Sequence, residues 1–295
     1  MPDRLTIRNG NVRAEIVPEL GGGLSRFDYG DQPVFRPWDG EPASRLASFV
    51  LIPWSNRISG GGFTFDGIFH PLAANRPGDA YPIHGNGFSS AWTVEFTTGD
   101  TVELSLASDG PGPFRYAARL RYAVFAHGLE MAMSVTSRAT LRLPYGIGFH
   151  PFFVRTPGTV LTANLPRIWL VDENQMPASL ASVDDRPDRD FRAGRTLPDS
   201  LINNAFPDWD GQARIDWPEH GLSMQINASA ELTCALIYSP SADAGFFCVE
   251  PVSHRVDSFN APGGAEAAGM RILAPGETMA ATCTFLLAPT DPALP

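Results

Sequence analysis

The sequence of 295 residues contains no lysine, and all 22 of its basic residues are arginine. A Schiff base requires a lysine amine, so this absence excludes pyridoxal-phosphate enzymes and aldolases of the imine type. A Walker phosphate-binding loop requires its lysine as well. The 32 acidic residues give a formal net charge of −10, which disfavours binding to nucleic acid or to an anionic membrane. We expect no partner of either kind.

Long apolar runs and paired cysteines are also scarce. No stretch approaches the roughly 18 apolar residues of a membrane span, and the segment after Met1 lacks the apolar core of a secretory signal. Each of the three cysteines, Cys234, Cys248 and Cys283, lies in an apolar run. Their odd number is typical of reduced core residues. These features predict a cytoplasmic protein, and the sequence leaves its oligomeric state open.

Polar and apolar residues alternate with a period of two through most of the chain, which indicates β-strands. The alternation covers residues 101–108, 115–126 and 129–136, with further strands expected at 13–18, 221–228, 232–238, 245–250 and 278–287. The 28 glycines and 27 prolines leave few windows for a helix. We predict an all-β fold, a large antiparallel β-sandwich that forms a single domain over residues 1–295.

One turn is predicted in detail. His127-Gly128 separates two alternating runs, and a short connection that ends in glycine is typical of a β-hairpin whose loop needs a positive φ.

His150 is the first candidate for chemistry. Pro151 follows it and restricts its backbone to an extended conformation, and Phe152 and Phe153 come next. An imidazole with an unperturbed pKa near 6.5 can donate or accept a proton at neutral pH. A core histidine bonded to a backbone carbonyl explains the same residue equally well.

Glu250 is the second candidate. Alternation along a strand places Phe246, Cys248 and Glu250 on one face, and burial would raise the pKa of this carboxyl into the range of a general base. We expect Pro251 to end the strand and leave Glu250 at a loop-rich rim. A salt bridge from Glu250 to Arg57 or Arg255 is the competing interpretation.

Two further residues are candidates for ligand binding. The planar guanidinium of Arg57 could hold vicinal hydroxyls or a carboxylate. His84 lies beside Gly85 and Gly87, which permit backbone conformations that other residues avoid. A structural ion pair for Arg57 and an exposed turn for His84 are the alternatives.

Metal and nucleophile motifs are missing from the sequence. His84, His150, Glu250 and His254 do not follow any of the usual metal-ligand spacings, and no G-x-S-x-G occurs. We therefore expect no metal and no other cofactor. What remains is proton transfer by one imidazole and one carboxylate to a polyhydroxylated small molecule.

Taken together, these segments resemble the aldose 1-epimerase (galactose mutarotase-like) family. The matching pieces run in order along nearly the whole chain: Asn56-Arg57-Ile58 with Gly62-Phe63, Asn75, His84-Gly85, Phe149-His150-Pro151-Phe152-Phe153, and Val249-Glu250-Pro251 with Asp257 and Asn260. The ordered set is specific for the superfamily and much less specific for the sugar. The resemblance implies a large antiparallel β-sandwich with its site in a groove on one face.

The resemblance also implies roles for individual residues. Glu250 is the general base for the C1 hydroxyl, and His150 is the general acid for the ring oxygen. Arg57 and His84 bind near the ring oxygen and the hydroxyls, and the matching Asn56 and Asn75 belong to the predicted sugar-binding set. The implied reaction interconverts the α and β anomers of a free aldose by ring opening and closure, without a cofactor.

Aromatic faces could complete the sugar site. Trp54, Phe152, Phe153 or Trp217 could stack on the apolar side of a pyranose, and each could equally belong to the core.

One position departs from the family pattern. Asn203 stands where the family usually has an aspartate that bonds sugar hydroxyls, and an amide carries no charge. The usual substrate preference is therefore open. Two alternatives follow: an epimerase of a sugar phosphate or other anionic sugar, with Arg57 and Arg76 as its cations, and a carbohydrate-binding protein of the same fold without turnover.

Overall fold

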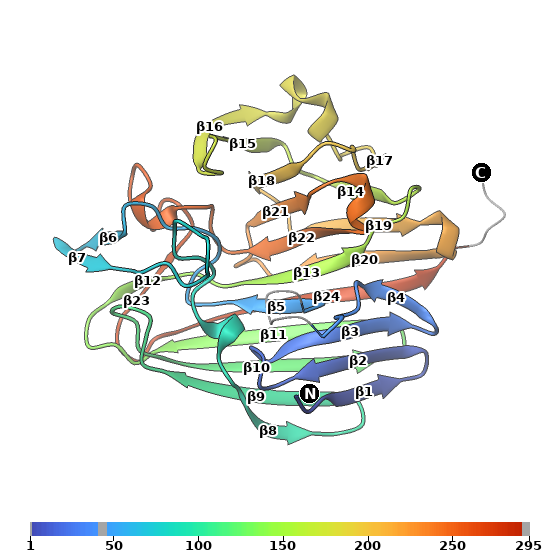
Figure 1. The fold of residues 1–295 in the computed structure, drawn as a ribbon, viewed down its shortest axis with the longest axis horizontal. Coiled ribbons are helices and arrows are strands. Elements are labelled where there is room, and N and C mark those ends of the chain that lie inside the picture. The colour runs from blue at the N-terminus through green and yellow to red at the C-terminus, as the bar shows by residue number, and fades with distance from the viewer. Residues whose placement is uncertain (1, 41–45, 291–295) are drawn as a thin grey trace.

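Two large antiparallel sheets of nine strands each form the framework of the protein (Figure 1). The structure is a computed structural model and describes residues 2–40 and 46–290. In the first sheet the strand order is β1-β2-β3-β4-β13-β22-β21-β18, with β5 paired to both β13 and β3. In the second sheet the order is β17-β14-β19-β20-β24-β11-β10-β9-β8.

The strands of the first sheet are β1 (Leu5–Asn9), β2 (Val12–Val17), β3 (Gly23–Tyr29), β4 (Gln32–Phe35), β5 (Ser48–Leu51), β13 (Gly148–Val154), β18 (Ile202–Pro207), β21 (Cys234–Ser239) and β22 (Phe246–Val252). Those of the second sheet are β8 (Thr93–Thr97), β9 (Thr101–Ser108), β10 (Tyr116–Phe125), β11 (Gly128–Ser137), β14 (Val160–Ala163), β17 (Arg195–Thr196), β19 (Gln212–Trp217), β20 (Leu222–Ala228) and β24 (Thr278–Pro289).

Smaller elements surround these sheets. Three two-stranded pairs join β6 (Gly62–Phe65) to β7 (Ile68–Pro71), β12 (Leu143–Tyr145) to β23 (Arg271–Leu273), and β15 (Arg167–Val171) to β16 (Pro177–Ser182). The helical turns are of the 3₁₀ type: η2 (Gly87–Ser89), η3 (Val183–Asp185), η4 (Pro187–Arg189), η5 (Pro218–His220), η6 (Ala242–Ala244) and η7 (Ser258–Asn260). No helix in the described residues is long and apolar enough to cross a membrane. The predicted all-β fold is confirmed.

Aromatic side chains fill the space between the two large sheets. Phe35 of β4 and Phe153 of β13 both pack against Phe285 of β24, with ring centroids 5.3 and 6.1 Å apart. Burial of apolar surface of this kind supplies roughly 25 cal/mol for each Å² removed from water. It is the main force that holds the two sheets face to face.

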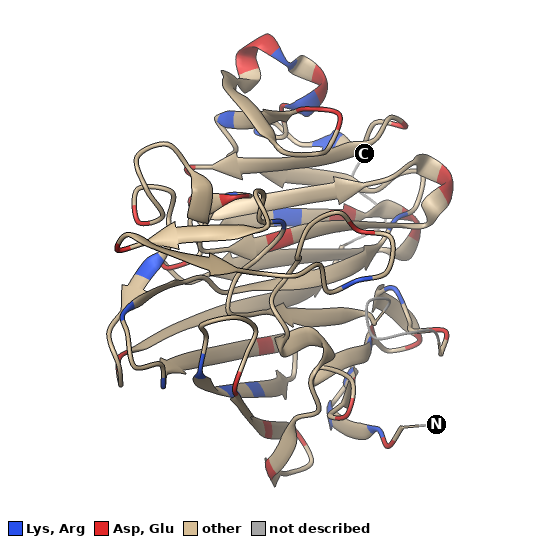
Figure 2. Cartoon of the chain, turned by 60° about the vertical axis from the view of Figure 1, so that its left-hand side comes forward, with Lys and Arg blue, Asp and Glu red and all other residues tan. Residues whose placement is uncertain are grey.

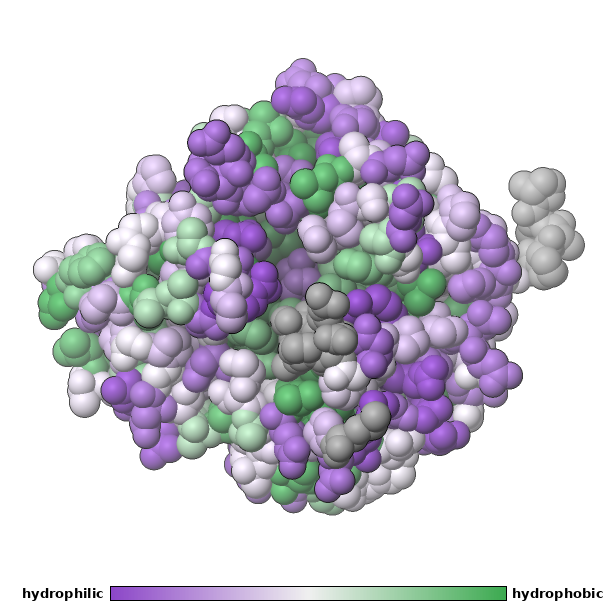
Figure 3. All heavy atoms as spheres, in the orientation of Figure 1, coloured by the Kyte–Doolittle hydropathy of each residue, from purple (hydrophilic) through white to green (hydrophobic). Residues whose placement is uncertain are grey.

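The first sheet is buried on its outer face as well. Alternate residues of β13 and β22 contribute to the inter-sheet core, whereas Phe152 and Cys248 belong to a second apolar cluster on the opposite face. A sheet covered on both sides reads as a nearly continuous apolar run, which explains the composition of residues 147–153. Figure 3 shows this outer face of the molecule hollowed near its middle, with hydrophilic side chains around the hollow.

The strands expected from the alternation are present, and β9 spans the predicted residues 101–108. The hairpin between β10 and β11 is also present, but its glycine was misinterpreted: Gly128 is the first residue of β11 and has no positive φ. A Cβ at this position would lie 2.2 Å from the backbone oxygen of Phe285. Glycine is needed there for close approach of the neighbouring strand.

The predicted end of the strand at Pro251 was wrong. β22 continues to Val252, with Glu250 opposite Leu236 and Pro251 opposite Ala235 of β21. A proline is tolerated within a strand where its missing N–H is not needed by the ladder. Glu250 therefore lies inside the sheet and not at its rim.

Substitution of Gly128 tests the close approach of β11 and β24. We expect Gly128→Ala to lower the free energy of unfolding by about 1–3 kcal/mol, because the strands must separate to admit the methyl group. Urea titration measures the change. Gly99→Ala is the matched control, since a Cβ there meets nothing within 4 Å, and its expected effect is within about 1 kcal/mol. Equal effects of the two substitutions would contradict the packing argument.

Candidate active site

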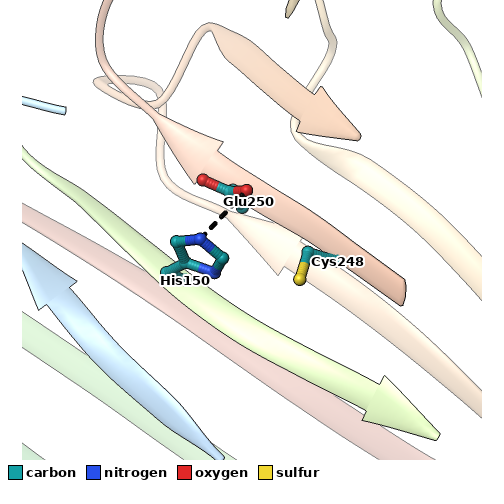
Figure 4. A group of neighbouring side chains, drawn as sticks. All are labelled: His150, Cys248 and Glu250. Carbon is teal, nitrogen blue, oxygen red and sulfur yellow. Dashed lines mark ion pairs between the residues drawn. The ribbon is translucent and has the colours of Figure 1, made fainter. Parts of the chain in front are cut away.

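The central feature of the site is a pair of ionisable side chains on neighbouring strands. β13 and β22 are antiparallel, with Gly148 opposite Val252 and Phe152 opposite Cys248. This register places His150 directly opposite Glu250. Directly opposed residues have Cβ atoms about 4.5–5.5 Å apart, and here His150 Nε2 lies 3.3 Å from Glu250 Oε1 (Figure 4).

Prolines follow both members of this pair. Pro151 and Pro251 have no N–H to donate. β13 and β22 pair before and after these positions, at Gly148 with Val252 and from Phe152 with Cys248 onward. The backbones are held instead by their other neighbours: His150 pairs with Phe49 of β5, and Glu250 pairs with Leu236 of β21. The His150–Glu250 pair thus sits on a framework that is hydrogen-bonded from both outer sides.

Burial shifts the proton affinities of the pair in opposite directions. The side chain of Glu250 is only 4% exposed, and this burial raises the pKa of its carboxyl to about 8, against a smaller opposing effect of the Arg57 charge. Burial lowers the pKa of His150 to about 3, and the Arg76 and Arg36 charges act in the same direction. Each group favours its neutral form, as expected for ionisable groups in a medium of low dielectric constant.

One oxygen of the pair has no partner within the protein. Glu250 Oε2 is buried and lacks a hydrogen bond to any described residue. An unpaired buried acceptor is unfavourable by about 1–3 kcal/mol. A ligand hydroxyl that donated to this oxygen would remove that penalty.

His84 lies beside the pair with a defined tautomer. Its backbone is left-handed (φ 61°), and its Nδ1 accepts the backbone N–H of Asn56 at 3.0 Å. The ring hydrogen is therefore on Nε2, which makes His84 a donor. Burial, with the charges of His150, Arg76 and Arg57, lowers the pKa of His84 well below its usual value, so the ring is neutral.

The pair lies in a groove of about 940 Å³ on the outer face of the first sheet. Strands β5, β13, β18, β21 and β22 and the connections that follow β4, β5 and β7 provide its lining: Arg36, Phe49, Asn56, Arg57, Arg76, Pro77, Ile83, His84, His150, Phe152, Asn203, Tyr238, Phe246 and Glu250. The aromatic and apolar lining with a few convergent polar groups is typical of a small-molecule site.

Comparison with known proteins agrees with this geometry. The family model described as aldose 1-epimerase matches residues 3–286 of the chain. The chain belongs to the aldose 1-epimerase family.

Two proteins with similar sequences come from Escherichia coli K12. The uncharacterized protein YphB is 31% identical over 280 residues, which cover 92% of this chain and 94% of YphB. The uncharacterized protein YihR is 27% identical over 269 residues, which cover 87% of this chain and 85% of YihR. Both matches therefore extend over most of this chain and most of each relative.

Solved structures with the same fold superpose closely. A candidate aldose 1-epimerase from Escherichia coli K12 gives a TM-score of 0.91 at 27% identity, covering 97% of this chain and 99% of that one. A galactose mutarotase-like protein from Clostridium acetobutylicum gives a TM-score of 0.85 at 19% identity, covering 97% and 95%. The predicted galactose mutarotase-like sandwich is confirmed.

The predicted site residues converge on the groove, with one exception. Glu250, His150, Arg57, His84, Asn56 and Asn203 all line it. Asn75 instead faces the backbone of the loop that carries His84: its Nδ2 donates to the carbonyls of Ile83 and Gly85 at 2.8 and 2.7 Å, and its Oδ1 accepts the N–H of Ile83 at 2.8 Å. These bonds make Asn75 a positioning residue for His84.

Asn56 and Asn203 are also engaged by the protein. Asn56 has a left-handed backbone (φ 59°), and its Oδ1 accepts hydrogen bonds from the backbone N and Nη1 of Arg57. Asn203 Nδ2 donates to Gln175 Oε1 at 2.8 Å, at the tip of the β15–β16 hairpin. Its Oδ1 can still accept from a ligand.

Cys248 is close to the pair as well. Its Sγ, a ring nitrogen of His150 and a carboxylate oxygen of Glu250 lie within 4.8 Å of one another (Figure 4), and this set could hold a soft divalent cation. Metal ligation requires a thiolate. Burial, with the charge of Glu250, raises the pKa of Cys248 well above its usual value, which favours the protonated thiol.

Some lining residues were missed by the sequence analysis. Arg36 follows the short strand β4, and Tyr238 lies on β21 beside Asn203; no motif marks either residue. Of the four aromatic residues considered for stacking, only Phe152 lines the groove, whereas Trp54, Phe153 and Trp217 lie in the inter-sheet core. Alternation along β13 could have separated Phe152 from Phe153.

The raised pKa of Glu250 should make the free energy of unfolding depend on pH. Because the folded carboxyl keeps its proton up to about pH 8, unfolding releases a proton between pH 4.5 and 8. Stability therefore falls as pH rises through this range, by up to about 1.4 kcal/mol for each pH unit. We expect Glu250→Gln to lack this loss. The free energy of unfolding of the variant minus that of the native chain should therefore increase from pH 5 to pH 8, as measured by urea titration.

The exposed Glu231 provides a matched control, since Glu231→Gln makes the same substitution at a surface turn. We expect that variant to follow the native chain at every pH. A constant difference between Glu250→Gln and the native chain over this range would contradict the buried, protonated carboxyl.

Proposed function

We propose that the protein is an aldose 1-epimerase that interconverts the α and β anomers of an aldose by general acid–base catalysis, with Glu250 and His150 as the two proton-transfer groups. The observation that carries the proposal is the 3.3 Å separation of His150 Nε2 and Glu250 Oε1 in a groove wide enough for a monosaccharide. In a cyclic aldose, O1 and the ring oxygen are both bonded to C1. Two groups this close can reach both oxygens of one sugar.

Ring opening then moves two protons. The Glu250 carboxylate takes the proton of the C1 hydroxyl, and the electron pair of that O–H bond becomes the second bond of the C1 carbonyl. The bond from C1 to the ring oxygen breaks, and its electron pair takes a proton from the His150 imidazolium. Rotation about the C1–C2 bond presents the other face of the aldehyde, and closure reverses both transfers to give the opposite anomer.

The pKa shifts support a mechanism in which Glu250 and His150 share one proton. Between about pH 3 and pH 8 the empty pair holds one proton, which resides on Glu250 because the pKa of its carboxyl lies above that of His150. A protonated Glu250 beside a neutral His150 is the state needed for ring closure. Burial therefore favours protonated Glu250 with neutral His150, the state in which the open-chain aldehyde is bound. This lowers the free energy of the aldehyde intermediate relative to the closed sugar.

The remaining polar groups would position the sugar. His84 presents Nε2–H as a donor, since Nδ1 is occupied by the Asn56 N–H. The Arg57 fork, oriented by Asn56 Oδ1 at 3.3 Å from Nη1, would bind hydroxyls near the reacting centre. The charge of Arg57 also opposes the rise in the pKa of Glu250, which helps this carboxyl to act as a base during opening.

A carbohydrate-binding protein without turnover is the alternative function. Binding alone does not require an acid and a base in contact, and a buried glutamate with an unpaired oxygen lowers the stability of the fold. The His150–Glu250 pair therefore favours catalysis.

Removal of either proton-transfer group tests the proposal. We expect Glu250→Gln and His150→Ala each to lower kcat by at least about 100-fold, since general acid or base catalysis contributes roughly 10²–10⁴ in rate. Exchange between the anomeric protons, measured by NMR at equilibrium, gives the rate without a coupling enzyme. Glu231→Gln serves as the control with unchanged activity. Native activity in either site variant would reject the assignment.

The pH dependence of the rate provides a second test. Above about pH 8 the pair loses its last proton and has no acid to deliver, so kcat/KM should fall about tenfold for each further pH unit. Below this limit we expect a plateau that extends to acidic pH, where His150 binds a second proton only near pH 3. Rates are corrected for the spontaneous reaction in buffer. A rate that keeps rising above pH 8 would be incompatible with the shared proton.

A further inference from the structure

The charge of the groove is opposite to that of the chain as a whole. The protein carries a net charge of −10, and its acidic and basic residues are distributed mainly over loops and outer edges (Figure 2). The groove, in contrast, is lined by Arg36, Arg57 and Arg76, and Glu250 is the one acidic residue among its described lining residues. The guanidinium groups thus outnumber the acidic side chains among the described lining residues.

Each arginine has a distinct place relative to the proton-transfer pair. Arg36 lies over the ring of Phe152, with Cζ 4.8 Å from the centroid, and Phe152 stacks on His150 with centroids 4.6 Å apart. Arg76 is anchored by an ion pair from Nε to Asp79 at 2.8 Å. The charges of Arg76 and Arg36 both lower the pKa of His150, whereas Arg57 acts on Glu250. Arg36 thus lies on the His150 side of the groove through its contact with Phe152, and Arg76 lines the same groove.

The orientation of a bound sugar follows from the chemistry. If His150 faces the ring oxygen and Glu250 faces O1, then C5 and its substituent C6 lie on the side of His150, away from Glu250. Neutral hydroxyls do not require two guanidinium groups at that end, because one donor suffices for each hydroxyl. A phosphate or carboxylate on C6 would match both cations and the planar geometry of their forks.

We propose that the substrate is an aldose with an anionic group on C6, a phosphate ester or a carboxylate, bound by Arg76 and Arg36 at the His150 end of the groove. This inference rests on the proposed function and specifies the substrate class of the same site. A lining without a second carboxylate, with the neutral Asn203 on β18, avoids repulsion of such a group.

The experiment compares glucose with glucose 6-phosphate and glucuronate, which share its ring and differ only at C6. Anomeric exchange is measured by NMR with the full-length protein. We expect kcat/KM for at least one of the two anions to exceed that for glucose by about tenfold or more, and the excess to shrink when NaCl is raised from about 0.02 to about 0.2 M. The two anions distinguish a phosphate site from a carboxylate site.

Arginine variants locate the anion. We expect Arg76→Gln to lower kcat/KM for the preferred anion about 10- to 100-fold more than for glucose, as for the loss of one charge-assisted hydrogen bond, and Arg76→Lys to retain part of the preference. Arg119→Gln removes the same charge from an exposed position on β10 of the second sheet and should leave the preference intact.

The outcomes separate the two proposals. A kcat/KM for glucose equal to or above that of both anions, or the same loss of preference in Arg76→Gln and Arg119→Gln, would overturn the anionic substrate while leaving the epimerase assignment in place. Failure to accelerate anomeric exchange of any of the three sugars would instead overturn the proposed function itself.

Discussion

Hydrogen bonding between the central strands of the first sheet determines where the two ionisable groups meet. The register of β13 against β22 places residues 150 and 250 opposite each other, and a shift of one residue would turn the two side chains to opposite faces of the sheet. The apolar residues on either side, such as Phe149 and Val249, lie in that core and resist such a shift. The position of the pair is thus a consequence of core packing.

The same packing sets the electrostatics of the site. Because the outer face of the first sheet is covered by an apolar cluster that includes Phe49 and Phe152, the pair is shielded from water and both members favour their neutral forms. Desolvation alone would make the carboxylate a rare species. The arginines affect the two groups differently: Arg57 opposes the effect of burial and favours the ionised Glu250, whereas Arg76 and Arg36 add to it and disfavour a charged His150. The site combines a low dielectric environment with fixed charges at its edge.

Sequence reasoning reached the fold and proposed two proton-transfer groups, but it could not give their spatial relation. The period-two alternation was sufficient for the strands, and the residue types of His150 and Glu250 pointed to proton transfer. The register that joins them was out of reach, because pairing of strands about 100 residues apart in the chain depends on the whole core. For the same reason the interpretation of Pro251 as a strand end was wrong: a local rule was overridden by the neighbouring strand β21.

The loops were predicted less well for a similar reason. Asn75 could be identified by its motif, but its three bonds to the backbone of the loop 83–85 depend on tertiary contacts. Arg36 and Tyr238 had no local signal, because a groove assembled from many strands collects side chains whose sequence neighbours are ordinary.

The groove draws its polar side chains from two parts of the molecule, the central strands and the connections outside the sheets. The proposed acid and base, His150 and Glu250, lie on the adjacent central strands β13 and β22, whereas His84, Arg57 and Arg76 lie on connections outside the two large sheets. Substitution of residues on these connections can therefore change which sugar binds, while the pair on β13 and β22 is unchanged. A scaffold of this kind can acquire new substrates while its proposed acid–base pair stays in place.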